Sequence, residues 1–413
     1  MTPNPTGWRQ LCSRSAGSAH LRPWPGALGA MSSAAEPLLL VVGDWYGQGG
    51  LQRQLGDLVE QWPDRSVTVL TWRRGWRPRR RRAGRVTVFA LPALQRWSVE
   101  LGSGRARLNT GIAVVGGVLA ALISRRRWRV AYAAGLHPEG TVAVIGAAPW
   151  RRRVVACTWL TGPLGNVARL QQAATPSLVR RAVGRAHWLV ADTQEAADEL
   201  IEAGFSPTRV RIVPGGIDLE RHKPASTQER AAARRSLGLA GGASIIACCC
   251  RLDLRQKRLD VLFEAWAAAR RPGWQLVVAG DGPDQRLVEQ LADRAGVTLL
   301  GWVGDARLVW RAADAFAFPT AAETTGLALV EAMATGLTGV VSALPTFVQR
   351  KPDGVRLISN KVSAWAQALG SIMDADQDVR RAEGARARLW AQGAHDVRST
   401  AAALAALLDS EGG

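Results

Sequence analysis

The chain has 413 residues, of which 47% are hydrophobic and 21% charged, and its formal net charge is +19. This length suits two domains of ordinary size, and the hydrophobic content indicates a globular protein rather than a disordered one. Lysine occurs at only four positions, so arginine supplies nearly all of the positive charge.

The first residues show no periodic pattern. Residues 1–30 contain Pro, Gly, Ser and Arg and lack the apolar core of a secretory signal, so we expect no export. Met31 directly precedes the first ordered pattern. We therefore expect translation to start at Met31 and residues 1–36 to form a disordered extension.

The cysteines indicate a reducing compartment. Cys12, Cys157 and the run Cys248–Cys250 have no spacing typical of a zinc site or of a disulfide framework. In "ASIIACCC" the three cysteines end an apolar strand, where cysteine behaves as a small buried hydrophobe. We predict a cytoplasmic protein without a metal site.

From Pro37 onward, short apolar runs alternate with amphipathic or Ala-rich segments, which is typical of a parallel sheet with crossover helices. The predicted strands of the first half are residues 38–43, 67–72, 86–91, 130–134, 154–159, 188–193 and 210–215. Between them, Gly111 to Ile123 is the longest strongly apolar run. It is shorter than the roughly 20 residues that span a bilayer, so we expect a buried helix.

Two arginine clusters lie in this half, "RRGWRPRRRRAGR" from Arg73 to Arg85 and the group formed by Arg125–Arg127 and Arg129. Such clusters suit an anionic membrane surface or nucleic acid. A solvated basic loop explains them equally well, because basic runs have a high false-positive rate. A peripheral position at the inner face of the membrane, through the Arg73–Arg85 region, stays open, whereas nucleic acid is suggested by charge alone.

After Gly215, a polar and charged stretch through Gly242 suits a hinge. The strand pattern then restarts at residues 243–250, 274–280, 297–301, 313–319 and 338–342. We predict an α/β protein with two doubly wound, Rossmann-like domains, residues 37–215 and 216–390, facing a central cleft. A last helix within 391–413 is expected to pack back toward the first domain. Ligands of such sheets bind at the carboxyl ends of the strands.

Two basic residues follow the predicted strand 243–250. In "RLDLRQKRLDVLFEA", Arg251 closes the strand and Lys257 lies at the start of a helix. A planar guanidinium and a mobile ammonium near a helix N-terminus suit a diphosphate. Lys257 is the more informative residue, because lysine is scarce in this chain.

Two carboxylates lie in "PTAAETTGLALVEAMATG", in which breakers and cap-type residues precede an apolar helix that starts near Gly326. Glu323 lies just before the helix N-terminus, where free N–H groups attract anionic or hydroxyl-rich ligands. Glu331 lies within the apolar stretch and needs a partner, either a backbone donor or a ligand. The turn "AGDGPD", which contains Gly282, is a weak signal by itself.

In their order and spacing, these segments resemble the family 4 glycosyltransferases, retaining enzymes of the GT-B fold that use nucleotide sugars. The resemblance runs from about Leu38 to the end of the chain, and its markers are "GQGGLQRQL", "GLHPEG", "RVRIVPGGIDLERHKP", "RLDLRQKRLDVLFEA", "LVVAGDGP", "GWVGD" and "ETTGLALVEAMATG". It implies transfer of a sugar from a nucleotide-sugar donor to a glycan or lipid acceptor, with no metal ion or other cofactor.

The resemblance also implies roles for the candidate residues. Glu331 would bind the ribose hydroxyls and Glu323 would contact the transferred sugar, while Arg251 and Lys257 would neutralise the diphosphate leaving group. The remaining donor-binding positions implied are Gly282, the backbone N–H groups of Thr325, Gly326 and Leu327, and the Gly49–Gly50 loop of the first domain.

The chain departs from the family in places. Many members carry a histidine at the end of the strand matching "VAYAA", where this chain has Ala134, and His137 is the nearest substitute as a catalytic residue. The usual glycine before the diphosphate arginine is Cys250. Two alternatives therefore stay open: a degenerate member that binds a nucleotide sugar or a partner without efficient turnover, and another GT-B enzyme such as a nucleotide-sugar epimerase.

Overall fold

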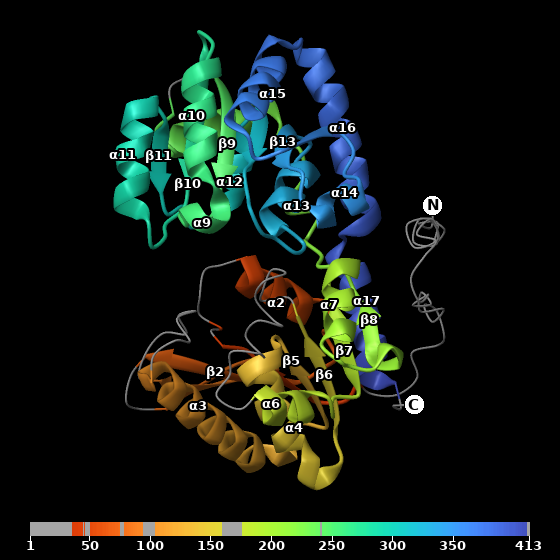
Figure 1. Cartoon of the computed structure of the whole chain (residues 1–413). Helices are drawn as coiled ribbons and strands as arrows, with labels where there is room; N and C mark the ends of the chain where they lie inside the picture. Colours follow the sequence, from red (N-terminus) through yellow and green to blue (C-terminus); the bar gives the residue numbers. More distant parts are fainter. Residues whose placement is uncertain are drawn as a thin grey trace. The chain divides into compact units, whose positions relative to one another are not determined.

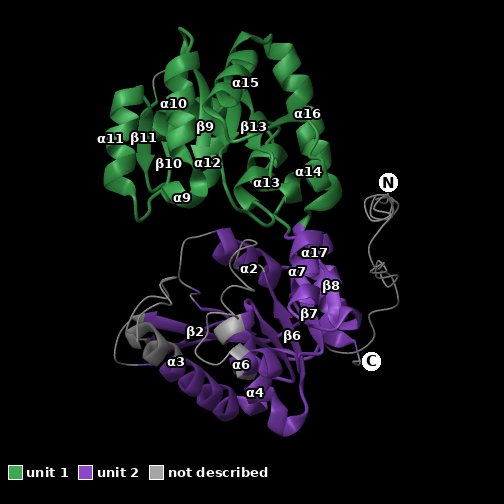
Figure 2. Ribbon diagram, in the orientation of Figure 1, with its two compact units in different colours: residues 1–11, 216–396 green, residues 12–215, 397–413 purple. Residues whose placement is uncertain are grey.

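The computed structural model describes residues 35–43, 45, 50–74, 78–93, 104–158, 176–239 and 242–410 (Figure 1). These residues form two compact units, shown in Figure 2. Of the described residues, unit 1 comprises residues 216–396, and unit 2 comprises those from 35 to 215 together with those from 397 to 410. Residues 1–34 of the expected 1–36 extension, with Cys12 and Met31, and the predicted site residue Gly49 lie outside the described residues, whereas residues 35 and 36 are described.

Unit 2 is built on an eight-stranded sheet with the order β3-β4-β2-β1-β5-β6-β7-β8. Its strands are β1 (Leu38–Val41), β2 (Val67–Arg74), β3 (Arg79–Ala83), β4 (Val86–Ala93), β5 (Val130–Ala133), β6 (Arg153–Cys157), β7 (Trp188–Ala191) and β8 (Val210–Ile212). Neighbouring strands are parallel except for β3, which pairs antiparallel with β4. The inner strands β1, β5 and β7 are buried along their whole length, as in parallel sheets that helices cover on both faces.

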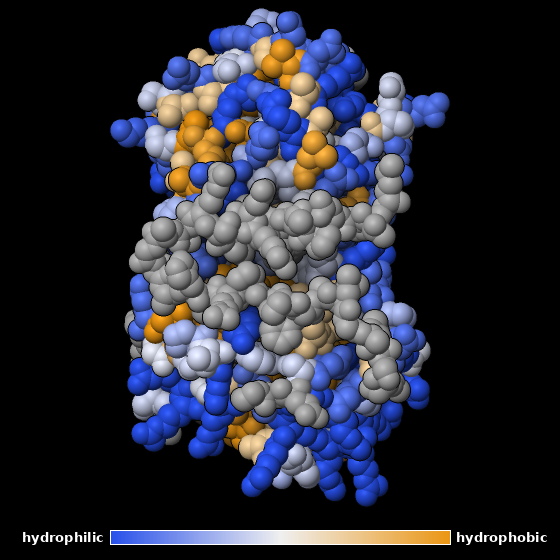
Figure 3. All heavy atoms as spheres, turned by 90° about the vertical axis from the view of Figure 1, so that its right-hand side faces the viewer, coloured by the Kyte–Doolittle hydropathy of each residue, from blue (hydrophilic) through white to orange (hydrophobic). Residues whose placement is uncertain are grey.

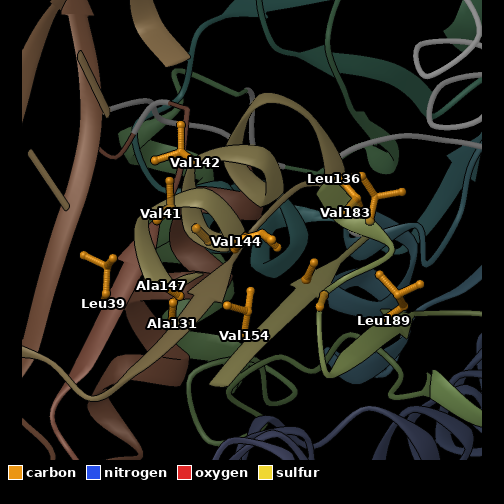
Figure 4. Close-up of a cluster of buried hydrophobic side chains, with 14 of the residues drawn as sticks. Leu39, Val41, Ala131, Leu136, Val142, Val144, Ala147, Val154, Val183 and Leu189 are labelled. Atoms are coloured by element: carbon orange, nitrogen blue, oxygen red, sulfur yellow. The ribbon is translucent and has the colours of Figure 1, made fainter. Parts of the chain in front are cut away.

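Helices cover the two faces of this sheet. The helical elements of unit 2 are α2 (Gly50–Glu60), α3 (Gly104–Ile123), η1 (Arg125–Arg127), η2 (Leu136–Gly140), α4 (Thr141–Ala147), η3 (Ala148–Trp150), α6 (Pro176–Val183), α7 (Gln194–Glu202), η4 (Pro207–Arg209) and α17 (Val397–Asp409). On one face, α3, α4, α6 and α7 pack over a core in which Val41 of β1 lies near Val142 and Val144 of α4 (Figure 4). On the other face, α2 and α17 pack over a second core.

The last helix, α17, is held by side chains from the segment between α2 and β2. The indole of Trp62 donates a hydrogen bond of 3.0 Å to the carbonyl of Ala401. The buried guanidinium of Arg65 donates to both carboxylate oxygens of Asp409, at 2.7 and 2.6 Å. The C-terminal segment is therefore an integral part of unit 2, although it follows unit 1 in the sequence.

Unit 1 contains a six-stranded, fully parallel sheet with the order β11-β10-β9-β12-β13-β14. Its strands are β9 (Ser244–Cys249), β10 (Trp274–Ala279), β11 (Thr298–Gly301), β12 (Ala315–Phe318), β13 (Thr338–Ser342) and β14 (Val355–Ile358). Its helices are α8 (Thr227–Ser236), α9 (Leu254–Lys257), α10 (Leu259–Ala269), α11 (Gln285–Ala295), α12 (Ala306–Ala312), α13 (Leu327–Ala334), α14 (Pro345–Arg350), α15 (Val362–Asp374) and α16 (Gln377–Ala394). One core lies against α10, α11 and α15, and the other against α8, α12, α13 and α16.

The predicted class, α/β with two doubly wound parallel sheets, is confirmed. Two strands lie outside the prediction. β3 contains four arginines of the Arg73–Arg85 cluster, for which we expected a membrane-binding surface or a solvated loop. β14 is a short, half-buried strand, and Arg356 interrupts its apolar pattern. The chain returns from unit 1 to unit 2 between Asp396 and Val397, shortly after α16 ends at Ala394.

The prediction of a helix at Gly111–Ile123 is confirmed, but the prediction that this helix is buried is wrong for one of its sides. The segment is the second half of α3, but Ile112, Val115, Leu119 and Ile123 are exposed. Among the residues that the structure describes, no helix is both long and apolar enough to cross a membrane. On the face drawn in Figure 3, the described surface is mostly hydrophilic and its hydrophobic residues form small separate groups.

Candidate functional site

Three neighbouring strands of unit 1 end at the same edge of the sheet. They are β10, β9 and β12, and the loops that follow them contain Gly282, Arg251 and Glu323 respectively. Since these strands are parallel, their carboxyl ends lie side by side, which is where open α/β sheets bind ligands. The sheet topology therefore brings three of the predicted site residues to one edge.

The clearest interaction at this edge joins Lys257 to Glu323. The Lys257 ammonium nitrogen forms an ion pair with Oε1 of Glu323, and the two side chains are only 11% and 15% exposed. Nζ also lies 5.5 Å from the centroid of the Phe318 ring. Burial by itself lowers the pKa of Lys257, but the charge and hydrogen bond of Glu323 outweigh it, so the pKa is raised overall. The site therefore holds a charged ammonium beside a carboxylate.

Gln256, which the sequence analysis did not single out, fixes the loop that carries Glu323. Its carbonyl accepts hydrogen bonds from the backbone N–H of Ala321 at 2.7 Å and from the hydroxyl of Thr320 at 3.1 Å. Its side-chain amide donates to the carbonyl of Ala322 at 3.0 Å. Because Gln256 directly precedes Lys257, these bonds align the β12 loop with α9. A glutamine between two basic residues gives no sequence signal for this role.

Glu331 lies in α13 and is 4% exposed. Its Oε2 accepts a hydrogen bond of 3.2 Å from the indole nitrogen of Trp310, a buried residue of α12. The sequence left a backbone donor or a ligand as partners for this carboxylate. The structure adds a third kind of partner, a tryptophan side chain, which stabilises the carboxylate before any ligand binds.

The start of α13 has the backbone geometry that the glycine in the motif predicts. Gly326 adopts a left-handed conformation with φ of 69°, and a Cβ there would lie 3.1 Å from Cζ of Phe347. Thr324 and Thr325 directly before it are buried. The first N–H groups of a helix, here beginning at Leu327, have no acceptor within the helix. This end of α13 can therefore donate hydrogen bonds to an anionic or hydroxyl-bearing ligand.

Arg350, at the end of α14, is a second residue that sequence reasoning missed. Its Nη1 donates to the carbonyl of Thr325 at 2.9 Å, and its Nη2 lies 2.6 Å from Nε2 of His395. A guanidinium has only donors, so this histidine nitrogen accepts. The guanidinium carbon lies 5.7 Å and 5.2 Å from the ring centroids of Phe347 and Trp390. In so arginine-rich a chain, nothing in the sequence distinguishes this arginine from the others.

The other predicted residues of unit 1 have distinct surroundings. Arg251 is exposed, and among the described residues its guanidinium has no hydrogen-bond or ion-pair partner. A Cβ on Gly282 would lie 2.6 Å from the backbone nitrogen of Leu252, so close packing of two loops already explains this glycine. Cys250, in the place of the family's glycine, has a lowered thiol pKa. The main cause is the hydrogen bond from Cys248, at 3.8 Å between the sulfurs, and the charge of Lys257 adds to it.

The predicted residues of the first domain belong to unit 2. Gly50 is the first residue of α2. Ala134, where many family members have histidine, is fully buried directly after β5. The backbone of His137 lies in η2, and its side chain is outside the described part of the structure.

Two family profiles match this chain. The profile described as "Glycosyltransferase Family 4" matches residues 48–221, in unit 2, and the one described as "Glycosyl transferases group 1" matches residues 243–375, in unit 1. The second match contains Arg251, Lys257, Glu323 and Glu331. The chain belongs to the family 4 glycosyltransferases.

Two curated relatives of this family 4 chain carry the same name. The chain is 35% identical over 280 residues to a D-inositol 3-phosphate glycosyltransferase of Nocardia farcinica, an alignment that covers 62% of this chain and 61% of the relative. It is 36% identical over 245 residues to the protein of the same name from Actinosynnema mirum, covering 54% and 58% of the two chains. The matched part thus spans about three fifths of the length of these relatives.

Solved structures show the fold. Alr3699/HepE of Anabaena, in complex with UDP and glucose, superposes with a TM-score of 0.73 at 19% identity, covering 91% of this chain and 100% of that one. WaaG, a glycosyltransferase involved in lipopolysaccharide biosynthesis, gives a TM-score of 0.67 at 18% identity, with coverage of 91% and 100%. The predicted GT-B fold of this family 4 chain is therefore confirmed.

Proposed function

We propose that this chain is a retaining glycosyltransferase that moves a sugar from a nucleotide-sugar donor to a glycan or lipid acceptor. The observation that carries the proposal is the Lys257–Glu323 ion pair at the carboxyl ends of three parallel strands, beside the N-terminus of α13. A buried ammonium, an exposed guanidinium at Arg251 and N–H groups that have no acceptor within helix α13 form a set of donors suited to a diphosphate.

The chemistry requires stabilisation of a departing diphosphate and of oxocarbenium character at the sugar. We assign the first task to Lys257 and Arg251, whose fixed positive charge supports the leaving group without a metal ion or other cofactor. We assign contact with the transferred sugar to Glu323. When phosphate oxygens approach Lys257, the ammonium can share its three donors between them and Glu323.

The remaining roles concern donor binding. Glu331, held by Trp310, would accept hydrogen bonds from the ribose hydroxyls. The N–H groups of Thr325, Gly326 and Leu327 would bind phosphate and sugar oxygens, with the turn at Gly282 lining the donor site. For residues of unit 2, we propose a donor-binding role for the Gly49–Gly50 loop and a catalytic role for His137.

The names of the relatives support a sugar-phosphate or glycan context. The curated relatives are named as D-inositol 3-phosphate glycosyltransferases, and the HepE structure holds UDP and glucose. UDP sugars are therefore the first donors to test, followed by GDP and ADP sugars. The absence of paired cysteine spacing and the basic charge support a place in the cytoplasm, at the inner face of the membrane.

The decisive experiment combines binding and turnover. A nucleotide sugar that binds the folded chain will raise its melting temperature, and that donor is then used to measure release of the nucleoside diphosphate. Lys257→Ala is expected to lower turnover by about 100-fold to 1,000-fold, the cost of removing one preorganised donor. Lys223→Ala, which removes an exposed lysine, is the matched control. Turnover of Lys257→Ala at the level of this control would refute the assigned mechanism.

A second candidate is a family member that binds nucleotide sugar without efficient transfer, and buried Ala134 in the place of the family histidine favours it. A donor-dependent rise in melting temperature with no release of nucleoside diphosphate would select this candidate. An epimerase would release a nucleoside diphosphate or an altered sugar without an acceptor. Retention is tested by proton NMR, because a retained anomeric configuration in the first product distinguishes it from inversion.

A further inference from the structure

Helix α3 of unit 2 has two sharply different sides. On one side it lies against α4 at small residues: a Cβ on Gly117 would be 2.9 Å from a methyl of Val142, and a Cβ on Gly146 would be 2.7 Å from Cβ of Ala121. This close approach fixes the rotation of the helix. The opposite side carries Ile112, Val115, Leu119 and Ile123, which are 48%, 60%, 53% and 80% exposed.

These four residues form one continuous stripe, which we call the α3 stripe. Their spacing of three, four and four positions places them on the same side of an α-helix. Isolated exposed hydrophobic residues are ordinary, but a row of large aliphatic side chains along one helix marks a surface that binds something apolar. The close contact with α4 excludes rotation of the stripe into the core.

Three arginine segments, distant in sequence, meet at the end of α3. Arg80 of β3 and Arg127 of η1 both lie over the ring of Phe89, at 5.7 and 5.5 Å. Arg125 and Arg152 both lie over the ring of Trp150, at 5.9 and 5.1 Å. The Arg152 guanidinium also donates to the carbonyl of Arg125 at 2.6 Å. The fold thus assembles one basic rim around the C-terminal end of the stripe.

In the part of the chain that the structure describes, no acidic side chain forms an ion pair with the arginines of this rim. Glu139 is the only acidic residue in the sequence from Leu101 to Ala191, and its side chain is buried. Burial, followed by the charges of Arg129 and Arg125, lowers the pKa of Arg152, as expected where guanidinium groups are crowded. All four arginines of β3 and those of η1 are exposed. Among the described residues, the rim therefore presents positive charge without an ion-pair partner, beside an apolar stripe.

We propose that the α3 stripe and its basic rim bind an anionic lipid bilayer, with α3 lying in the interface and the arginines on lipid phosphates. An aliphatic stripe flanked by basic residues is the pattern of helices that lie in the membrane surface, where apolar burial and attraction to anionic lipids add together. Nucleic acid would satisfy the arginines but would leave the aliphatic side chains in water. The inference rests on the proposed function at the membrane, and it names the surface that would reach a lipid-bound acceptor.

The test is co-sedimentation of the full chain with vesicles of phosphatidylcholine, with and without phosphatidylglycerol. The unaltered chain is expected to bind the vesicles that contain phosphatidylglycerol, and less so as salt is raised. The double variant Val115→Glu/Leu119→Glu is expected to lose at least about tenfold in vesicle binding, because charges replace the buried apolar contacts. The double variant Arg80→Glu/Arg127→Glu is expected to lose binding and its salt dependence.

Matched controls use exposed leucines of unit 1. Leu287 on α11 is 48% exposed and Leu389 on α16 is 67% exposed, so Leu287→Glu and Leu389→Glu change hydrophobicity and charge in the same way at another surface. Both variants should bind vesicles like the unaltered chain. Circular dichroism and melting curves check folding, and Ile123→Asn, at the most exposed position of the stripe, replaces any variant that fails to fold. The donor-induced rise in melting temperature should be unchanged in the stripe variants, which separates this surface from the donor site.

Three results would overturn the proposal. The first is equal vesicle binding by the stripe variants and the unaltered chain. The second is equal binding to neutral and anionic vesicles. The third is binding of double-stranded DNA or RNA that competes with vesicles and does not change in the Val115→Glu/Leu119→Glu variant, which would identify the rim as a nucleic-acid surface.

Discussion

Lys257, at the end of α9, and Glu323, in the loop before α13, form a mostly buried ion pair that joins the carboxyl ends of β9 and β12. Removing either partner leaves the other charge in a poorly solvated position. Lys257→Ala is therefore expected to lower the free energy of unfolding by roughly 3 kcal/mol, in addition to its effect on turnover. Urea unfolding monitored by circular dichroism measures this change.

A double-mutant cycle separates structure from chemistry at this pair. The variant Lys257→Ala/Glu323→Ala should be about 1–3 kcal/mol more stable than the sum of the two single effects predicts, because no unpaired charge remains. Its turnover should nevertheless stay as low as that of the worse single variant. Additive changes in stability would show that the two side chains do not interact in solution, and recovered turnover would show that they serve only the fold.

Glu331 combines a structural contact with a proposed binding role, and two substitutions distinguish them. Glu331→Gln keeps an oxygen that can accept from Trp310, so the free energy of unfolding should change by less than about 1 kcal/mol. Affinity for UDP should fall about tenfold, because charge-assisted bonds to hydroxyls are lost. Glu331→Leu leaves the buried indole N–H without this acceptor and should cost about 1–3 kcal/mol. Calorimetric titration and melting curves provide the two measurements, and unchanged UDP affinity in Glu331→Gln would remove the ribose role.

Arg350 is predicted to position the loop before α13 rather than to touch the reacting atoms. Arg350→Met keeps an unbranched side chain beside Phe347 and Trp390 but loses the donors to Thr325 and His395. The KM for the donor should rise by about tenfold with a smaller change in kcat, because a loosened loop weakens binding before it weakens chemistry.

The controls for Arg350 exploit its geometry. Arg350→Lys should recover only part of the affinity, since an ammonium cannot reproduce the planar arrangement of donors. Arg286→Met, at an exposed position of α11, should leave both kinetic constants unchanged. Equal losses of kcat and kcat/KM in Arg350→Met, with KM unchanged, would place Arg350 in the reaction itself.

The sequence predicts what depends on pattern along the chain. Apolar runs bounded by glycine and polar residues predict the inner strands well, because strands buried on both faces must be continuously apolar. β3 is different: its Arg79–Arg82 run is stabilised by pairing with β4, a tertiary contact that intrinsic β-propensity does not report. The exposure of one side of α3 could not be predicted from the sequence for the same reason. The contact of its small residues with α4, and not hydrophobicity, decides which side of the helix is buried.

The candidate site shows the same limit. Lys257 and Glu323 stand out in the sequence because each carries a scarce or costly charge in the segment that follows a strand. Gln256 donates a hydrogen bond to a backbone carbonyl, and Arg350 contacts a backbone carbonyl and a histidine. These partners are distant in the sequence, and a backbone carbonyl gives no signal in the sequence. Trp310 lies 21 positions from Glu331, and only the packing of α12 against α13 makes it a donor. Supporting contacts of this kind require the fold.

The acidic face of α7 makes the stability of unit 2 depend on pH. Burial, followed by the charges of Glu195, Glu202 and Asp192, raises the pKa of Glu199 from 4.5 to about 7. The folded state therefore holds this proton more tightly than the unfolded chain does. The resulting stabilisation is complete below about pH 4.5 and is lost as the pH rises through about 7.

Glu199→Gln removes the titration, so the variant should melt at a higher temperature than the unaltered chain at pH 8 and at a similar one at pH 5. The gain should be on the order of 1 kcal/mol, because water screens this partly exposed group. Glu264→Gln, at an exposed position of α10, is the control, and an equal response of both variants at pH 8 would attribute the effect to net charge instead of to Glu199.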